Sequence, residues 1–580
     1  MVQVWLKINK KQSRYLSIVV MLSAMVVLLL AVTAYERHAD EQHPDRDIDL
    51  FGRRGEAVAA DELEIKIVCS GQYELIKVWR KGSGEDNDGK KYDSDELYAF
   101  LPAGADLRQV SLYYNDRKLQ VLLDGRRYRS GEGIEDLKLM QSYELVAEQG
   151  KGSEHSRLTF VQSANLPVAF ITTESGSTTK LRQDKNNRES GTFKVIDMDG
   201  TVDYDGELAW ISGRGNSSWS FEKRPYIIKL RDDTSLLGMA AASKWVLFAN
   251  AFDDADGLRN QMAYQLAANA GMEYSCDLKF IDLYINEIYA GTYQLCEKIE
   301  VHKNRLDIGY LDEANEEINP GLRSLEGTYA DGVGLDIKTP RDHSGGYILE
   351  RNYGSKLTDK PFYFTTQNNE GFVVREPSMV SDVEMEYIRG CFQSVENAIL
   401  ADDGIDEISG KYYTELIDME SWAKKFLMNV ITKGESIGDT SSYFYKKQGD
   451  DLVYAGPAWD FDKSFARQEV IGDPSILMDH IGETQWWQSV YEKPEFYDMT
   501  VRCYWEDFRP YLLKMADKYL DEWADYIAGS NEMNWLRWPE SAEDYDFPLS
   551  NDEGLDNTTE FLKNWLRLRV AYLDSLWQME

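Results

Sequence analysis

Cysteine and histidine are scarce in this chain, which has five cysteines and six histidines among 580 residues. The cysteines are far apart, with no CxxC pair, and no histidines stand at metal-ligand spacing. A disulfide framework and a structural zinc site are therefore excluded, and we expect mostly free, buried thiols with at most one bridge. The five are Cys69, Cys276, Cys296, Cys391 and Cys503.

Basic residues are outnumbered by acidic ones, with 64 lysines and arginines against 100 aspartates and glutamates, so the formal net charge is −36. This balance argues against nucleic acid and anionic lipid as partners of the globular part. Hydrophobic residues make up 43% of the chain, which is enough for packed cores and excludes general disorder. The length predicts two or more domains.

Several familiar catalytic motifs are also missing. The chain has no GxxxxGK[ST] phosphate loop, no GxSxG nucleophile elbow, no HExxH helix and no HRD triplet. An acidic stretch from Asp197 to Glu207 hints at calcium, but its glycine is misplaced for a twelve-residue calcium loop. A solvated turn is the preferred interpretation of that stretch.

The first long apolar run is residues 16–34, which carry no charged side chain. At 1.5 Å per residue they span about 28 Å, close to the ~30 Å hydrocarbon thickness of a bilayer. Four basic residues precede the run, which predicts a cytoplasmic stub at 1–15, a transmembrane helix at 16–34 and an extracytoplasmic body. A cleaved signal peptide is the alternative, but the run is longer than a usual h-region of about 7–15 residues.

The rest of the chain predicts an α+β protein with several parts. Residues 35–60 are polar and indicate a flexible stalk. Short β-like runs between turn residues predict a small β-sandwich-like domain over 61–150, and a linker is expected at 150–156. A mixed region follows, in which Asp253 or Asp254 is expected to cap a helix that carries Leu258, Met262 and Leu266 on one face. The pattern becomes helical after about residue 380.

A glycine-bearing turn at 213–219 lies between two predicted strands, 208–212 and 226–230. Glycines there let backbone amides approach an anion without obstruction by side chains. From Arg214 to Arg231 there are five basic residues and one acidic residue, which favours a site for a polyanion. A solvated β-hairpin is the alternative interpretation.

Two aspartates flank a second predicted hairpin, which runs from Ser442 to Tyr454. Because a hairpin brings its ends together, we expect Asp439 before it and Asp460 after it to be neighbours. Such a pair suits magnesium-dependent phosphoryl transfer, in which one carboxylate orients the attacking hydroxyl and the other holds the metal. Paired acids also serve glycoside hydrolysis, but the basic glycine loop favours a nucleotide.

The order of strand, glycine loop, lysine-bearing strand, helix, two strands and exit is similar to the small lobe of a protein kinase. Six motifs in sequence resemble the CotH kinase family, named for a bacterial spore-coat protein, over about residues 160–470. They are 213–218 (GRGNSS), 224–230 (RPYIIKL), 258–260 (LRN), 291–293 (GTY) with 297–298 (EK), 345–350 (GGYILE) and 459–462 (WDFD).

This resemblance implies a divergent two-lobed kinase fold over 156–580, with an N-lobe at about 160–300 and a C-lobe at about 301–580. It implies an atypical kinase that uses ATP with Mg²⁺ or Mn²⁺ and phosphorylates serines of a coat or surface protein. By resemblance Lys229 contacts the phosphates, Asp439 is the catalytic-loop aspartate and Asp460 is the metal ligand. The other nucleotide contacts it implies are Arg214, Asn216, Trp245 and Glu297.

One departure from the kinase pattern concerns the second metal ligand. Many kinases carry an asparagine shortly after the catalytic aspartate, whereas Asp439 is followed by Thr-Ser-Ser-Tyr-Phe. Asp462 takes over that role, or one metal suffices. A non-catalytic pseudokinase scaffold that binds wall or coat components is therefore kept as the alternative to an active kinase.

Overall fold

The computed structural model describes residues 64–578, apart from gaps at 70, 83, 86–90, 93, 117, 151, 252, 254, 256, 323–332, 435–440, 466–484 and 540–553. The predicted anchor at 16–34, the stalk and Asp439 lie outside the described residues. Within the described ranges, none of the helices combines the length and the apolar character needed to cross a bilayer. The architecture is a mixture of sheets and helices, consistent with the α+β prediction.

The first part of the described chain is built from two sheets that share one hydrophobic core. Buried side chains such as Ile67, Phe100 and Leu145 fill this core. The strands are β1 (Glu64–Cys69), β2 (Gln72–Lys77) and β7 (Ser111–Tyr113) in one sheet, and β3 (Trp79–Arg80), β6 (Glu96–Leu101), β8 (Leu119–Leu123), β9 (Arg126–Tyr128), β10 (Ser142–Gln149) and β11 (Gly152–Gln162) in the other. Strands β4 (Gly84–Glu85) and β5 (Lys91–Tyr92) pair separately.

The linker expected at 150–156 is instead part of a β-hairpin. Strands β10 and β11 pair in register from Ser142↔Thr159 to Gln149↔Gly152, and β11 then runs parallel to β6. The glycines of this stretch serve the tight turn, in which Gly150 has a φ of 65°. The prediction of a linker was wrong because the first residues of β11 are largely exposed. The alternation of exposed and buried side chains that indicates a strand begins only after Glu154.

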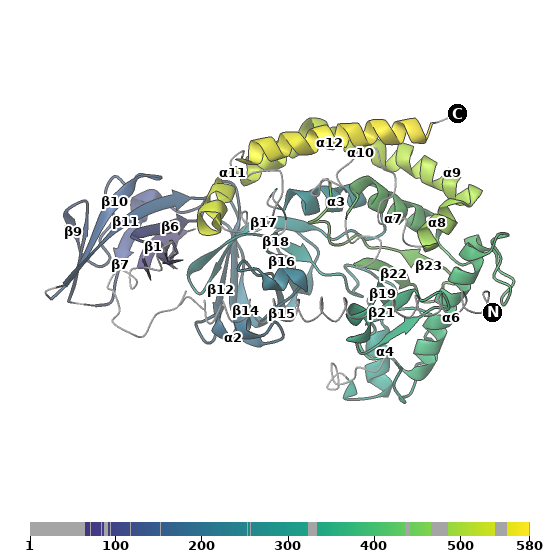
Figure 1. Cartoon of the computed structure of the whole chain (residues 1–580). Helices are drawn as coiled ribbons and strands as arrows, with labels where there is room; N and C mark the ends of the chain where they lie inside the picture. Colours follow the sequence, from purple (N-terminus) through teal and green to yellow (C-terminus); the bar gives the residue numbers. More distant parts are fainter. Residues whose placement is uncertain are drawn as a thin grey trace, which may run out of the picture. The chain divides into compact units, whose positions relative to one another are not determined.

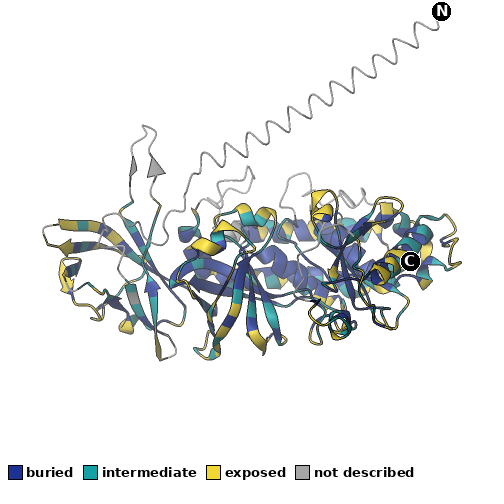
Figure 2. Ribbon diagram, turned by 90° about the horizontal axis from the view of Figure 1, so that it is seen from below, coloured by how far each residue is buried: buried dark blue, intermediate teal, exposed yellow. Residues whose placement is uncertain are grey.

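A closed barrel follows, in which antiparallel neighbours are completed by the parallel pair β12–β17. Its strands are β12 (Val168–Thr173), β13 (Arg188–Ile196), β14 (Val202–Gly213), β15 (Tyr226–Thr234), β16 (Ala242–Phe248), β17 (Leu278–Ile285) and β18 (Ile288–Glu297). Side chains such as Ile228, Trp245 and Leu283 form the barrel core. Figure 2 shows buried residues, in dark blue, interspersed with more exposed ones along the strands. Helix α2 (Thr179–Gln183) connects β12 to β13.

Helix α3 (Leu258–Asn269) leads from the barrel to a five-stranded sheet with the order β20–β21–β19–β22–β23. We call this sheet the second sheet, since it follows the barrel sheet in the part of the chain that the family motifs cover. The strands of that sheet are β19 (Tyr347–Arg351), β20 (Tyr363–Thr365), β21 (Gly371–Glu376), β22 (Ser442–Lys446) and β23 (Val453–Ala455). Its helices are α4 (Leu311–Ile318), α5 (Ser355–Thr358), α6 (Asp382–Leu400), α7 (Met419–Thr432), α8 (Gln485–Tyr491) and α9 (Pro494–Cys503) (Figure 1). The predicted hairpin at 442–454 is confirmed as β22–β23.

The last helices are α10 (Arg509–Lys514), α11 (Leu520–Arg537) and α12 (Gly554–Leu576). Helix α11 binds the barrel at strand β18, where the Thr292 backbone N–H donates to Asn534 Oδ1 over 3.2 Å. The Trp538 indole N–H donates to the Ala290 carbonyl over 2.9 Å. A Cβ at Gly291 would lie 2.7 Å from Asn534 Oδ1, so only glycine permits this close approach.

One buried carboxylate joins three parts of the described chain. Asp282 on β17 accepts hydrogen bonds from Ser163 next to β11, Tyr289 and Thr292 on β18, and Ser530 on α11. Asp282 is fully buried, and burial raises its pKa to about 6 despite these donors. Cys276, Cys296, Cys391 and Cys503 are free thiols, and all of these but Cys391 are buried, as the sequence predicted.

Candidate functional site

A cavity of about 320 Å³ is lined by segments that are far apart in the sequence. The barrel contributes the turn between β14 and β15 and the end of β16, and the second sheet contributes residues of β19, β21 and β22. The third contribution is the loop after β23, which carries Asp460 and Asp462. The cavity thus joins the glycine loop and the Trp-Asp-Phe-Asp motif that the sequence singled out separately.

The glycine loop has a fixed shape in this structure. Gly215 has a φ of 89°, a conformation that favours glycine, and a Cβ there would also force the Ser218 hydroxyl to move. The Lys185 ammonium donates to the Gly215 carbonyl over 3.0 Å. The Arg214 guanidinium carbon lies 4.8 Å from the Phe248 ring centroid and 5.7 Å from the Trp459 ring centroid. Because aromatic faces hold a guanidinium while leaving its N–H groups available, this position suits an anion contact.

Asp460 is held from both its side chain and its backbone. Its Oδ2 accepts a hydrogen bond from Ser441 Oγ over 2.7 Å, and its backbone N–H donates to the Tyr264 hydroxyl over 3.4 Å. Ser441 and Asp460 have φ values of 56° and 71°, which are unusual for residues other than glycine. Backbone conformations of this kind cluster where a side chain must be aimed, as a metal-binding carboxylate must be.

Helix α3 fixes the segment that follows Asp460. Asn260 Oδ1 accepts the backbone N–H of Phe461 over 3.0 Å, and the Arg259 guanidinium donates to the Ser464 carbonyl over 2.8 Å. Arg259 also pairs with Asp253 at 2.5 Å, and both side chains are fully buried. The Leu-Arg-Asn motif therefore anchors the Trp-Asp-Phe-Asp motif.

The start of helix α3 differs from the sequence prediction. Asp253 or Asp254 was expected as the N-cap, but the helix begins at Leu258 after Gly257, whose φ is 98°. Asp253 acts from further upstream, because its carboxylate accepts the backbone N–H groups of Ala255, Gly257 and Arg259. The carboxylate still stabilises the positive end of the helix.

The cavity carries more positive than negative side chains, in contrast to the chain as a whole. Its acidic residues are Glu350, Asp460 and Asp462, and its basic residues are Arg214, Lys356, Lys360, Arg375 and Lys463. Burial, and after it the charge of Arg375, lowers the pKa of Lys360. Positive charges that crowd one another in a concave site favour binding of a polyanion.

The residues present fit a hard divalent cation held together with a polyphosphate. Asp460 and Asp462 line one cavity, and Mg²⁺ is usually bound by one or two carboxylates, with phosphate oxygens and water completing its octahedron. The part of the chain that the structure describes contains no group of three or more His, Cys, Asp or Glu side chains able to hold a metal alone. Of the acidic stretch at 197–207, residues 197–201 form the turn between β13 and β14, in which the Thr201 N–H donates to Asp199 over 2.8 Å, and the rest belongs to β14.

The model of the family described as CotH kinase protein matches residues 211–573 of the chain. The chain belongs to the CotH kinase family. The resemblance inferred from the six motifs is therefore confirmed. No curated protein shows significant similarity to the chain.

Three residues that the CotH kinase resemblance predicted to contact the nucleotide do not line the cavity. Lys229 is on β15, where Tyr226, Ile228 and Leu230 face the barrel core and Lys229 therefore faces the other way. Trp245 is fully buried in the barrel core, and its indole N–H donates to the Ala242 carbonyl over 3.0 Å. Neither side chain lines the cavity.

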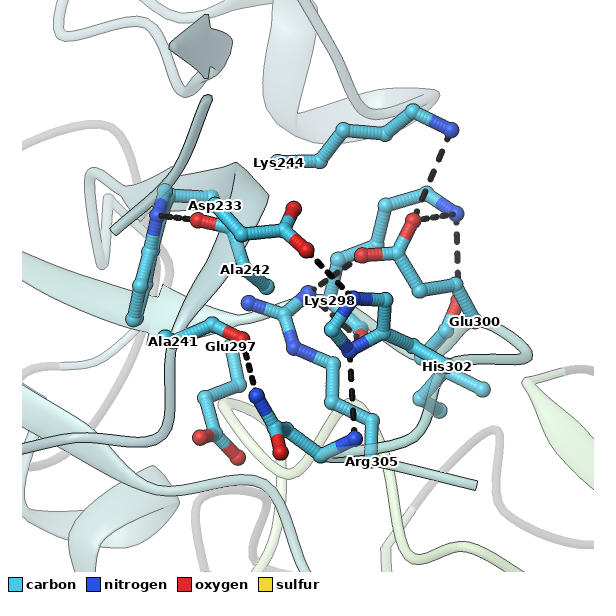
Figure 3. Close-up of polar contacts among 12 residues, drawn as sticks. Asp233, Ala241, Ala242, Lys244, Glu297, Lys298, Glu300, His302 and Arg305 are labelled. Carbon is cyan, nitrogen blue, oxygen red and sulfur yellow. Dashed lines mark hydrogen bonds and ion pairs between the residues drawn. The ribbon is translucent and has the colours of Figure 1, made fainter. Parts of the chain in front are cut away.

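Glu297, the third of these residues, is buried at the end of β18. It accepts hydrogen bonds from the Tyr274 hydroxyl over 2.9 Å and from the Asp277 N–H over 3.1 Å. Figure 3 shows the neighbouring ion pairs, in which Glu300 contacts Lys244 at 3.4 Å and Arg305 at 2.7 Å. This network stabilises the exit from the barrel of the CotH kinase domain.

The structure brings four predicted site residues together, namely Arg214, Asn216, Asp460 and Asp462. Asp439 lies outside the described residues, so its predicted closeness to Asp460 stays a prediction. Sequence reasoning missed Lys356, Lys360 and Arg375, although the Gly-Gly-Tyr-Ile-Leu-Glu motif of the family ends at Glu350 beside them. Basic residues near that acidic end were the available signal.

Proposed function

We propose that this CotH kinase family member transfers the γ-phosphoryl group of ATP to serine hydroxyls of a protein substrate, within a two-lobed kinase-like fold. The observation that carries the proposal is that the Arg214 loop and the Asp460 segment line the same cavity. Phosphoryl transfer depends almost entirely on positioning and charge stabilisation. The cavity has a positive charge held in place at Arg214 and a carboxylate held in place at Asp460.

The roles follow from the contacts. Arg214, held on Phe248 and Trp459, and the backbone amides of the glycine loop would bind phosphate oxygens. Asp460 and Asp462 would hold Mg²⁺ or Mn²⁺, which when bound neutralises charge on the transferred group. Asp439 is proposed to orient the serine hydroxyl. Ser441 and Tyr264 keep the Asp460 carboxylate and backbone in place.

The test is transfer of labelled phosphate from ATP to the full chain itself or to serine-rich peptides, with Mg²⁺ or Mn²⁺. We expect transfer by the wild type and its loss in Asp460→Ala. Asp232→Ala, an exposed aspartate on β15 outside the cavity, is the matched control and should keep full activity. A folded wild-type chain that transfers no phosphate under these conditions would refute the proposal.

The pseudokinase alternative keeps one supporting observation, the absence of an asparagine after Asp439. It predicts nucleotide binding without turnover. A thermal shift with Mg-ATP in a chain that is inactive in the transfer assay would favour it, because a ligand at about 100 times its Kd adds ~2.7 kcal/mol of stability.

We also propose that residues 16–34 anchor the chain in the membrane and that the body lies on the extracytoplasmic side. The support is the uncharged run and the four basic residues before it. A phosphatase reporter that is active only outside the cytoplasm, fused after Glu580, should be active. Activity of a reporter that works only inside would reverse the orientation, and release of the full chain by alkaline carbonate would refute the anchor.

A further inference from the structure

The wall of the cavity formed by the second sheet is rich in hydrogen-bond donors. Lys356 on α5, Lys360 just after it and Arg375 on β21 all line the cavity. Asn352 lines it as well, is 4% exposed, and its Nδ2 has no hydrogen-bond partner among the described residues. A buried amide donor without a partner is costly, which indicates that a ligand or water completes it.

From this wall we infer a second anion subsite, made by Asn352, Lys356, Lys360 and Arg375, which binds a phosphate group without a metal ion. Backbone contacts hold the four residues on one framework. The Asn352 N–H donates to the Gly371 carbonyl over 2.9 Å, and the Val374 N–H donates to the Phe362 carbonyl over 3.0 Å. The segment 352–362 is thereby folded back along β21.

A glycine is essential to this framework. A Cβ at Gly371 would collide with the Asn352 carbonyl oxygen, so a larger residue would push the segment off the strand. The close approach keeps Asn352 next to the start of β21 while Arg375 stands near its end. The subsite is therefore built into the sheet and does not depend on the conformation of exposed side chains alone.

Basic side chains outnumber acidic ones on this wall, as far as the described residues that line it show. Glu350 is the acidic side chain on this wall, and its Oε2 accepts the Arg375 Nε–H over 2.5 Å. Three cations thus face one carboxylate, and the pKa of Lys360 is lowered by burial and by the Arg375 charge. A phosphate dianion offers three acceptor oxygens and about two negative charges, which match the remaining donors and charge.

Two sources can supply this phosphate. One is the polyphosphate tail of the nucleotide donor, and the other is a phosphoserine already present on the protein acceptor. Both would lie in the same cavity as Asp460, which Tyr443 also lines. The assignment of the phosphate to a nucleotide or to a phosphoserine rests on the proposed function, whereas the binding of phosphate at this subsite does not.

The test is isothermal titration of the full chain with inorganic tripolyphosphate in the presence of EDTA. We expect binding by the wild type that weakens as salt is added, and at least about tenfold weaker binding by Lys356→Ala/Lys360→Ala. The control Lys411→Ala/Lys447→Ala removes the same charge outside this cavity and should bind as the wild type does. Arg375→Lys should also weaken binding, because the forked guanidinium is lost.

Competition identifies the source. Displacement of tripolyphosphate by ATP and not by a phosphoserine peptide assigns the subsite to the donor, and displacement by the phosphoserine peptide and not by its unphosphorylated form assigns it to the acceptor. Absence of metal-free binding by the wild type, or equal binding by the two double variants, overturns the subsite. Transfer activity is measured on the same samples, so that loss of the subsite and failure of the kinase proposal are separate results.

Discussion

Asn260 Oδ1 accepts the backbone N–H of Phe461 over 3.0 Å, although the two residues are 201 positions apart in the chain. This bond joins helix α3 to the loop that carries Asp460 and Asp462. The Leu-Arg-Asn motif of the CotH kinase family thereby acquires a structural role, which is to position the loop and not to contact substrate.

Asn260→Ala should lower phosphate transfer strongly while leaving the fold intact. The variant leaves the Phe461 N–H buried without a partner, at a cost of about 1–3 kcal/mol, and the loop can relieve that cost by moving. Transfer rate and circular dichroism should be measured together. Asn269→Ala, which removes an exposed asparagine from the same helix, is the control, and equal activity of the two variants would contradict the positioning role.

The Arg259–Asp253 pair predicts a large loss of stability for Arg259→Met. Both side chains are fully buried, and breaking such a pair leaves an uncompensated charge, which costs about 3–5 kcal/mol. Asp253→Ala should cost at least as much, because three backbone N–H groups also lose their acceptor. Urea midpoints of both single variants and the double variant form a cycle, and strictly additive effects would show that the two residues do not interact.

Lys425 gives a pH-dependent prediction. It is fully buried on α7, no hydrogen-bond partner of its ammonium is found among the described residues, and burial lowers its pKa to about 7. Between about pH 7 and its usual pKa of 10.5 the unfolded chain holds the proton and the folded chain does not, so stability should rise with pH across that window. Each unit of the shift is worth about 1.4 kcal/mol.

Lys425→Met keeps the length of the side chain and removes the charge. We expect its advantage in stability over the wild type to be largest at pH 7 and below, and to shrink as pH approaches 10. Thermal unfolding of both chains from pH 6 to pH 10 measures this difference. A difference that does not change with pH would contradict the assignment.

Asp282 predicts the opposite slope. Because burial raises its pKa to about 6 from a usual 3.8, the folded chain holds the proton between these values and the unfolded chain does not. The contribution of Asp282 to stability should therefore be greatest below about pH 4 and be lost as pH rises through 6. Relative to Asp282→Asn, the wild type should lose stability between pH 4 and pH 6. Thermal unfolding of the two chains across this range measures the difference, and a difference that stays constant would contradict the assignment.

Much of the local structure could be predicted from sequence, because it depends on neighbours in the chain. The β22–β23 hairpin and the glycine turn at 213–219 follow from short runs of apolar residues between turn residues. Apolar side chains alternate along 226–230, with Tyr226, Ile228 and Leu230 on the buried face. This pattern predicts that Lys229 faces away from the barrel core.

The composition of the cavity could not be predicted in the same way. Arg214, Arg375 and Asp460 come together only through pairing of distant strands and through the hydrogen bond between Asn260 and Phe461. The start of α3 was misplaced because Asp253 acts on three N–H groups across an irregular turn, which no capping pattern in the sequence describes.

The contact of α11 with strand β18 at Gly291 has a practical consequence for dissecting this protein. Asn534 and Trp538 complete hydrogen bonds of the barrel, and Ser530 shares Asp282 with Ser163. A fragment that stops before α11, or starts after Ser163, would leave polar groups of the barrel exposed or unsatisfied. Because β11 also pairs with β6 and β10, boundaries for expression should fall before β1 and after α12, not at the limits of the family match.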